Sequence, residues 1–78
     1  MTRATSGRVS LDSTILAAAF YDGRHARLEL DFRDGTRYRY SGVAPNVYGE
    51  LLRATSKGSF FNQHIRGHFP YAKTVHEN

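Results

Sequence analysis

Cysteine is absent from this chain of 78 residues, so neither disulfides nor thiolate metal sites can stabilise its fold. Long apolar runs are absent too, because none approaches the roughly 18 residues that a membrane span requires. The N-terminal segment Met1–Arg8 lacks the apolar stretch of a signal peptide. We therefore expect one small cytoplasmic domain that is held together by hydrophobic contacts and has no membrane partner.

Acidic residues are missing from one long stretch. No Asp or Glu lies between Leu51 and His76, and the whole chain carries a net charge of +4. A basic balance favours an acidic partner, of which nucleic acid is the commonest. The residues that we expect to contact phosphates all lie in or near this acid-free stretch: Arg53, Lys57, His64, Arg66 and Lys73. Such contacts hold a nucleic-acid backbone without reading its sequence.

Catalytic and metal-binding patterns are also lacking. The chain shows no Ser-His-Asp order, no phosphate-loop motif and no paired buried carboxylates, so we expect no catalytic residue, no enzyme activity and no cofactor. His64 and His68 have the one-turn spacing of some zinc sites. Gly67 lies between them and no Cys or carboxylate stands nearby, so we interpret them as surface histidines and expect no metal.

The hydrophobic pattern predicts three strands. Residues 14–21 are apolar on both alternating faces, which suits a strand covered on both sides. Residues 26–32 and 36–40 alternate between apolar and charged positions. A three-residue loop at Arg33-Asp34-Gly35, with glycine in a left-handed bulge position, sets the register between these two strands. It places Leu28 opposite Tyr40, Glu29 opposite Arg39, Leu30 opposite Tyr38 and Asp31 opposite Arg37.

Two helices are expected after the strands. Pro45 suits the first position of a helix, Gly58 a left-handed position that closes it, and Ser59 the cap of a second helix. The fold class that we predict is α+β, a three-stranded antiparallel β-meander followed by two short helices packed on one sheet face. We divide the chain into a flexible basic tail (1–12), one domain (13–73) and a polar C-terminal tail (74–78).

A series of short motifs runs through the predicted domain in a fixed order. They are Tyr21-Asp22, Phe32 with Gly35, Tyr38-Arg39-Tyr40, Val43, Pro45, Leu51, Ala54, Ser56-Lys57-Gly58, Phe60-Phe61-Asn62 and Ile65. Together they resemble the KTSC domain, a family found at the C-terminus of some lysyl-tRNA synthetases and as free-standing small bacterial proteins. The resemblance implies the fold. It implies RNA binding only through the attachment to a tRNA-handling enzyme.

Aromatic residues supply candidates for base stacking. Tyr38, Tyr40 and Phe60 are the candidates, because aromatic rings on small domains often stack on bases. The alternative is that Tyr38 and Tyr40 belong to the core. The predicted register places them on the face of Leu28 and Leu30, so we favour the core interpretation.

The turn between the two predicted helices is a candidate anion site. Ser56, Gly58 and Ser59, with the charge of Lys57, have the composition of a loop that cradles an anion at a helix start. A helix–helix turn capped for stability alone explains the same residues, and we favour that interpretation.

The sequence is compatible with two functions. The first is an RNA- or DNA-binding accessory module that uses the basic helical region. The alternative is a protein-interaction module that docks on a larger translation or transcription enzyme through a sheet edge or a helix face. Exposed rings at Tyr48, Phe60, Phe69 or Tyr71 beside basic groups would favour nucleic acid, and an apolar patch away from charge would favour protein. The sequence leaves the oligomeric state open.

Overall fold

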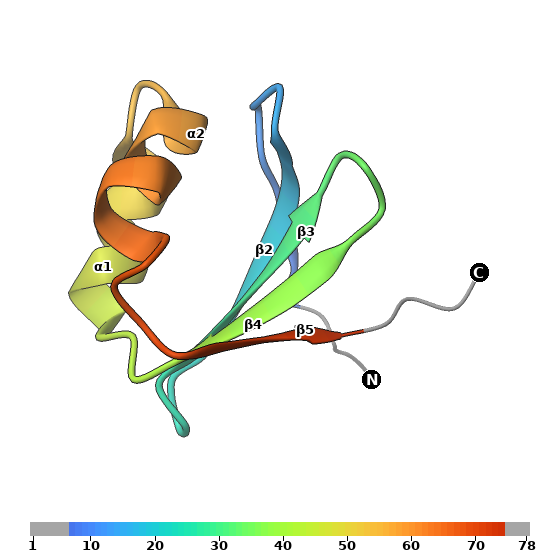
Figure 1. The fold of residues 1–78 in the computed structure, drawn as a ribbon. Helices are drawn as coiled ribbons and strands as arrows, with labels where there is room; N and C mark the ends of the chain where they lie inside the picture. Colours follow the sequence, from blue (N-terminus) through green and yellow to red (C-terminus); the bar gives the residue numbers. More distant parts are fainter. Residues whose placement is uncertain (1–6, 75–78) are drawn as a thin grey trace, which may run out of the picture.

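The computed structural model describes residues 7–74, which form one antiparallel sheet with a helical layer on one face (Figure 1). The five strands follow one another in the order β1-β2-β3-β4-β5. The elements are β1 (Val9–Ser10), β2 (Leu16–Asp22), β3 (Arg27–Phe32), β4 (Arg37–Ser41), α1 (Pro45–Arg53), α2 (Lys57–Phe60), the π-helical turn η1 (Phe61–Ile65) and β5 (Tyr71–Thr74).

The α+β class, the meander and the helices on one face are confirmed, but the prediction of three strands is wrong. Strand β1 lies inside the segment expected to be a tail, and β5 follows the helices at the predicted end of the domain. These strands have two and four residues, which is too short for a period-two pattern to stand out. Pairing with the longer strands creates them, as in Val9 opposite Ala19 and Tyr71 opposite Tyr40.

The register between β3 and β4 agrees with the prediction in every pair. Leu30 lies opposite Tyr38, and Asp31 lies opposite Arg37. The turn uses the three-residue loop, because the N–H of Phe32 donates to the carbonyl of Thr36 at 2.8 Å and Gly35 has φ +94°. A left-handed glycine at this position matches the right-handed twist of the two strands.

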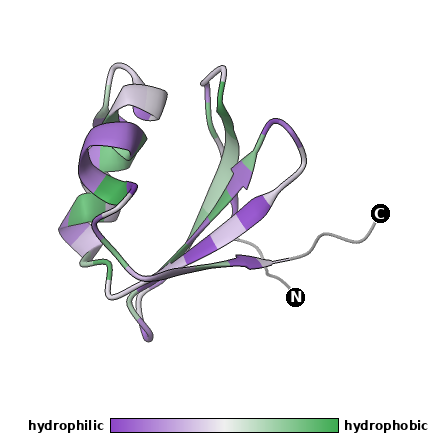
Figure 2. Ribbon diagram, in the orientation of Figure 1, coloured by the Kyte–Doolittle hydropathy of each residue, from purple (hydrophilic) through white to green (hydrophobic). Residues whose placement is uncertain are grey.

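Strand β2 is not covered on both sides, contrary to expectation. The register shifts at Ala17, so Leu16 and Ala19 both point to the core although they are three positions apart. On the other face, the ring of Phe20 lies 5.6 Å from the guanidinium carbon of Arg8. The bulge explains why this strand shows no simple alternation (Figure 2).

The first helix begins with Pro45, as predicted, but it ends earlier than expected, at Arg53. Gly58 lies inside α2 and is not left-handed. A Cβ at Gly58 would lie 3.0 Å from Cδ1 of Ile15, so any larger residue there would have to displace the end of that side chain. The cap of the second helix is Ser56 rather than Ser59, because the Ser56 side chain accepts the N–H of Ser59.

The helices and the sheet share one core. Phe61 and Ile65 of η1 are 6% and 0% exposed, and the N–H of Arg66 donates to the carbonyl of Phe61 at 2.8 Å to close the wide turn. The other buried hydrophobic residues are Leu11, Leu16, Ala19, Leu28, Leu30, Tyr40, Val43 and Leu51. Leu11 belongs to the segment that we expected to be a flexible tail, and its burial places that part of the segment in the fold.

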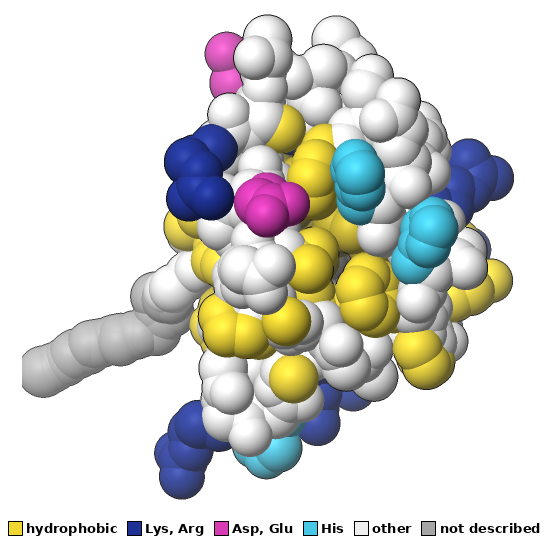
Figure 3. Space-filling model, turned by 90° about the vertical axis from the view of Figure 1, so that its left-hand side faces the viewer, with side chains coloured by type: hydrophobic (Ala, Val, Ile, Leu, Met, Phe, Trp, Pro, Cys, Tyr) yellow, Lys and Arg dark blue, Asp and Glu magenta, His cyan; other side chains and the backbone are white. Residues whose placement is uncertain are grey.

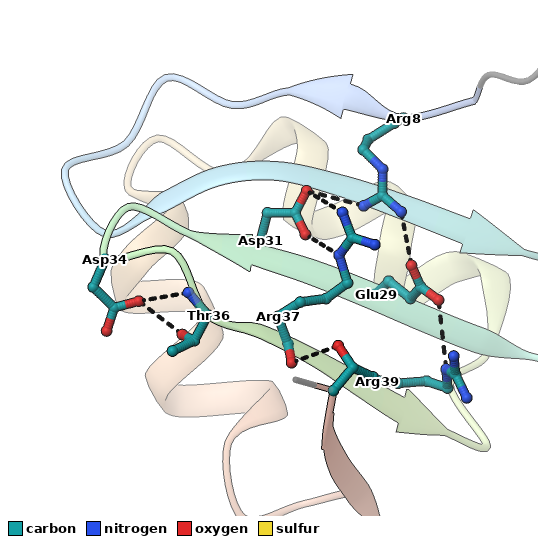
Figure 4. Close-up of polar contacts among 8 residues, drawn as sticks. Arg8, Glu29, Asp31, Asp34, Thr36, Arg37 and Arg39 are labelled. Carbon is teal, nitrogen blue, oxygen red and sulfur yellow. Dashed lines mark hydrogen bonds and ion pairs between the residues drawn. The ribbon is translucent and has the colours of Figure 1, made fainter. Parts of the chain in front are cut away.

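The face of the sheet away from the helices carries a network of ion pairs (Figure 4). The predicted partners are present, with Arg37 Nε 2.5 Å from Asp31 Oδ1 and Arg39 Nε 3.4 Å from Glu29 Oε2. Arg8 joins them, with its guanidinium nitrogens 2.7 Å from Glu29 and 3.1 Å from Asp31. Three arginines therefore share two carboxylates, which neutralise most but not all of the positive charge of these arginines.

Candidate nucleic-acid interface

An open cleft of about 510 Å³ lies between the sheet edge and the helical turn η1. Strand β4 contributes Tyr38 and Tyr40, because positions two apart share a face. Strand β5 adds Tyr71, which pairs with Tyr40, and η1 with the turn that follows it adds the opposite wall. The lining residues are Ile15, Phe32, Asp34, Thr36, Tyr38, Tyr40, Phe61, Asn62, Arg66, Gly67 and Tyr71.

Tyrosine rings line the sheet side of this cleft. The rings of Tyr38 and Tyr71 are parallel to within 1°, with centroids 5.4 Å apart, and Tyr40 lies 5.9 Å from Tyr71. Tyr71 is 61% exposed, whereas Tyr40 is 2% exposed. Tyr71 thus offers an accessible ring that is held flat by its neighbour, which is the geometry on which another planar ring can stack.

Two charged side chains line the same cleft. Arg66 is exposed, and within residues 7–74 its guanidinium makes one hydrogen bond, a long one of 3.4 Å to the Asn62 side chain. Asp34 accepts hydrogen bonds from the hydroxyl and the N–H of Thr36. These bonds, with a smaller contribution from the charge of Lys73, lower the pKa of the Asp34 carboxyl. The cleft therefore combines a loosely held guanidinium with an ionised carboxylate.

Burial also affects the ionisation of the Tyr40 hydroxyl. Its pKa is raised to about 12, chiefly by burial, and Tyr38 and Tyr71 add to the effect while Arg66 opposes it. Tyr40 therefore presents a neutral hydroxyl beside Arg66 at alkaline pH as well as at neutral pH.

The three stacking candidates have different positions. Tyr40 is part of the core, in agreement with the core interpretation that we favoured. Tyr38 is half-buried beneath Tyr71. Phe60 does not line the cleft, because its ring packs against His64 at 4.6 Å. The accessible ring is Tyr71, which was not among the predicted stacking residues but was one of the rings whose exposure beside basic groups would favour nucleic acid. The sequence gives little indication of this role, because Tyr71 is a single aromatic residue that follows the predicted end of the second helix at Gly67 and Pro70.

The basic candidates do not gather into one patch. Arg66 lines the cleft, and Lys73 lies opposite Tyr38 on the same edge of the sheet. Lys57 donates to the carbonyl of Ala54 at 3.0 Å, and the guanidinium of Arg53 folds back over Gly49. The view onto the helices shows Lys and Arg at the margins, and histidine, acidic and hydrophobic side chains nearer the middle (Figure 3).

Two of the donors in the candidate anion turn already have partners. The N–H of Ser59 donates to Ser56 Oγ at 3.3 Å, and the Lys57 ammonium is bound to Ala54 as above. This geometry favours a turn capped for stability.

Neither a metal-binding cluster nor a helix that could cross a bilayer occurs in the described part of the chain. Within residues 7–74 no three His, Cys, Asp or Glu side chains come together to hold an ion. None of the helices in that range has the length and apolar character of a membrane span.

The fold is a small antiparallel sheet with a single helical layer over one face and an aromatic cleft at its edge. The family model of the KTSC domain matches residues 12–69. The chain therefore belongs to the KTSC domain family, as the resemblance of its motifs implied.

The chain is similar to both small and large proteins. An uncharacterised protein of Stutzerimonas stutzeri is 45% identical over 56 residues, which cover 72% of this chain and 79% of that protein. A lysine–tRNA ligase of Nostoc punctiforme is 32% identical over 60 residues, which cover 77% of this chain but 11% of the ligase. The crystal structure of a KTSC domain protein of Yersinia pestis superimposes with a TM-score of 0.84 at 33% identity and covers 87% of this chain and 96% of that one.

Proposed function

We propose that this domain binds single-stranded nucleic acid in the cleft between the β4–β5 edge and η1, without catalysing a reaction. The observation that carries the proposal is Tyr71, a 61% exposed ring stacked flat on Tyr38 beside the guanidinium of Arg66. A base stacks on the outer face of Tyr71, and the neighbouring phosphate contacts Arg66. Lys73, on the same strand as Tyr71, adds a second positive charge near the cleft.

The similarity to two lysine–tRNA ligases supports RNA as the partner, since their name records a tRNA substrate. The ion-paired face of the sheet supports the same location, because Asp31 and Glu29 already neutralise much of the charge of Arg37 and Arg39. This proposal moves the site from the whole basic helical region to the cleft around Arg66. Arg53 and Lys57 are at most peripheral to it.

Fluorescence anisotropy with labelled RNA hexamers tests the stacking contact. Tyr71→Ala should weaken binding by about 5- to 150-fold, because base–aromatic stacking contributes roughly 1–3 kcal/mol per base. Tyr71→Phe keeps the ring and should bind within about threefold of the original chain by the same reasoning. Equal affinities for Tyr71→Ala and the original chain, or no binding of any hexamer near physiological salt, would contradict the proposal.

Docking on a protein is the second candidate function, and one observation favours it. The helical layer exposes parts of Val47, Tyr48, Leu52, Phe60 and Phe69, and hydrophobic side chains gather in the middle of this face (Figure 3). A partner that covers this face would not contact Tyr71, so its binding should be insensitive to Tyr71→Ala. The same variant therefore separates the two functions.

A further inference from the structure

A second hollow of about 490 Å³ adjoins the aromatic cleft. It lies between the segment before β2 and the start of α2, and Asp12, Thr14, Thr55 and Lys57 line it. Ile15 and Asn62 line both hollows, so these two side chains form the boundary between them. A ligand that leaves the cleft past Asn62 enters the second hollow directly.

The chemistry of the second hollow differs from that of the cleft. It has no aromatic ring, and hydroxyl groups predominate among its lining residues. Thr14 and Thr55 are exposed, and their hydroxyls make no hydrogen bond within residues 7–74. The Asp12 carboxylate accepts hydrogen bonds only. Neutral hydroxyls beside a carboxylate suit the hydroxyl groups of a sugar, which both donate and accept.

The boundary between the hollows is fixed by packing. Arg33 holds the segment before β2, with Nη2 donating to the Leu11 carbonyl and Nε to the Ser13 carbonyl, each at 3.0 Å. Ile15 is 41% exposed, and its Cδ1 rests where Gly58 has no side chain. The second hollow therefore exists before a ligand arrives, which limits the ordering cost of binding.

We propose that the cleft and the second hollow are consecutive subsites for one RNA strand. The base on Tyr71 occupies the first, and the sugar of an adjoining nucleotide occupies the second, where Thr14, Thr55 and Asp12 contact the ribose 2′-hydroxyl and distinguish RNA from DNA. The connecting phosphate passes Asn62, within reach of Arg66, with which Asn62 shares a hydrogen bond. This inference rests on the proposed function, because it assumes that a base occupies the cleft.

The first test is a charge at the boundary. Asn62→Asp changes the shape of the side chain very little and places a carboxylate beside the Arg66 guanidinium, which already bonds to the Asn62 side chain. It should nevertheless weaken binding of an RNA tetramer at least tenfold, through repulsion of the connecting phosphate. The matched control is Gln63→Glu, the same change of charge at the next, exposed position, which lines neither hollow. It should weaken binding less than threefold.

The second test compares sugars and lengths. RNA tetramers should bind at least tenfold more tightly than a labelled mononucleotide and several-fold more tightly than the matching DNA tetramers. Thr55→Val, which replaces one hydroxyl by a methyl group, should reduce the preference for RNA over DNA. Ser10→Ala, a hydroxyl lost from the far edge strand β1, should leave that preference unchanged.

The outcomes separate the two proposals. RNA and DNA tetramers that bind equally, or equal effects of Asn62→Asp and Gln63→Glu, would overturn the second subsite while leaving binding at Tyr71 intact. Failure of every oligonucleotide to bind would overturn both.

Discussion

Tyr40 shows how one residue joins the core to the cleft. It lies under η1 at 2% exposure, yet its hydroxyl is affected by the charges of Tyr38, Tyr71 and Arg66. Burial disfavours the phenolate, so the pKa of Tyr40 rises to about 12, whereas an unfolded chain would ionise near 10. The folded state therefore holds the proton of Tyr40 over a pH range in which the unfolded chain has lost it.

Stability should fall at alkaline pH for this reason. The contribution of Tyr40 is fully present below about pH 10 and is lost as pH rises towards 12, because the unfolded state then binds fewer protons than the folded state. Thermal melts at pH 9 and pH 11 should show a smaller drop in Tm for Tyr40→Phe than for the original chain. Tyr71→Phe, on an exposed ring, is the control. Identical drops in all three proteins would contradict this account.

The short strand β1 and Leu11, the residue after it, make more contacts that stabilise the sheet than the length of this segment suggests. Leu11 is 4% exposed, its N–H donates to the Ala17 carbonyl at 2.9 Å, and its carbonyl accepts from Arg33. Arg8, just before β1, bridges both carboxylates of β3. This segment therefore closes one edge of the sheet and also supports the boundary of the second hollow.

Truncating the buried side chain measures that contribution. Leu11→Ala should lower the free energy of unfolding by about 2–5 kcal/mol, the range for removing a buried leucine side chain to Cβ. In a domain of 78 residues this is a large part of the total stability. Val9→Ala, at a 39% exposed position of β1, should cost far less. Urea unfolding curves with equal midpoints for the two variants would show that this segment contributes little to the fold.

Nucleic-acid binding by the whole molecule should depend more on where its charges lie than on its net charge. The chain carries a net charge of +4, but Arg8, Arg37 and Arg39 are bound to two carboxylates on the face opposite the helices. Among the described residues, the guanidinium of Arg66 bonds only to the Asn62 side chain, and it lies in the cleft. The arginine that releases counterions on binding should therefore be Arg66.

A salt series tests this distribution. Arg66→Gln should lower the slope of log K against log salt by about 0.7 for single-stranded RNA, the value for one lost phosphate contact. Arg37→Gln removes the same charge from an ion pair, and Arg24→Gln removes it from the exposed turn between β2 and β3. Both should change the slope little. Equal decreases in all three variants would indicate a diffuse attraction of a basic protein to a polyanion.

Local chemistry made much of this fold predictable. The register of β3 and β4 followed from strict alternation and from a turn that requires a left-handed glycine at Gly35. The start of α1 followed from Pro45, whose missing N–H costs nothing at a first helical position. The order of the family motifs identified the KTSC domain, which the match over residues 12–69 confirms.

The edge strands of the sheet and the aromatic cleft depend on contacts between distant parts of the chain. Strands β1 and β5 form because longer strands offer them unpaired N–H and C=O groups, and two or four residues carry no periodic signal of their own. At Gly58 the side chain of Ile15 approaches the backbone closely. The two residues are more than forty positions apart in the sequence, so no local pattern predicts this contact. Tyr71 becomes an exposed platform only because β5 returns to β4 and sets its ring flat on Tyr38. The alternation, the turns and the family motifs could be recognised without a structure, because they depend on neighbours along the chain. The candidate site depends on neighbours in space.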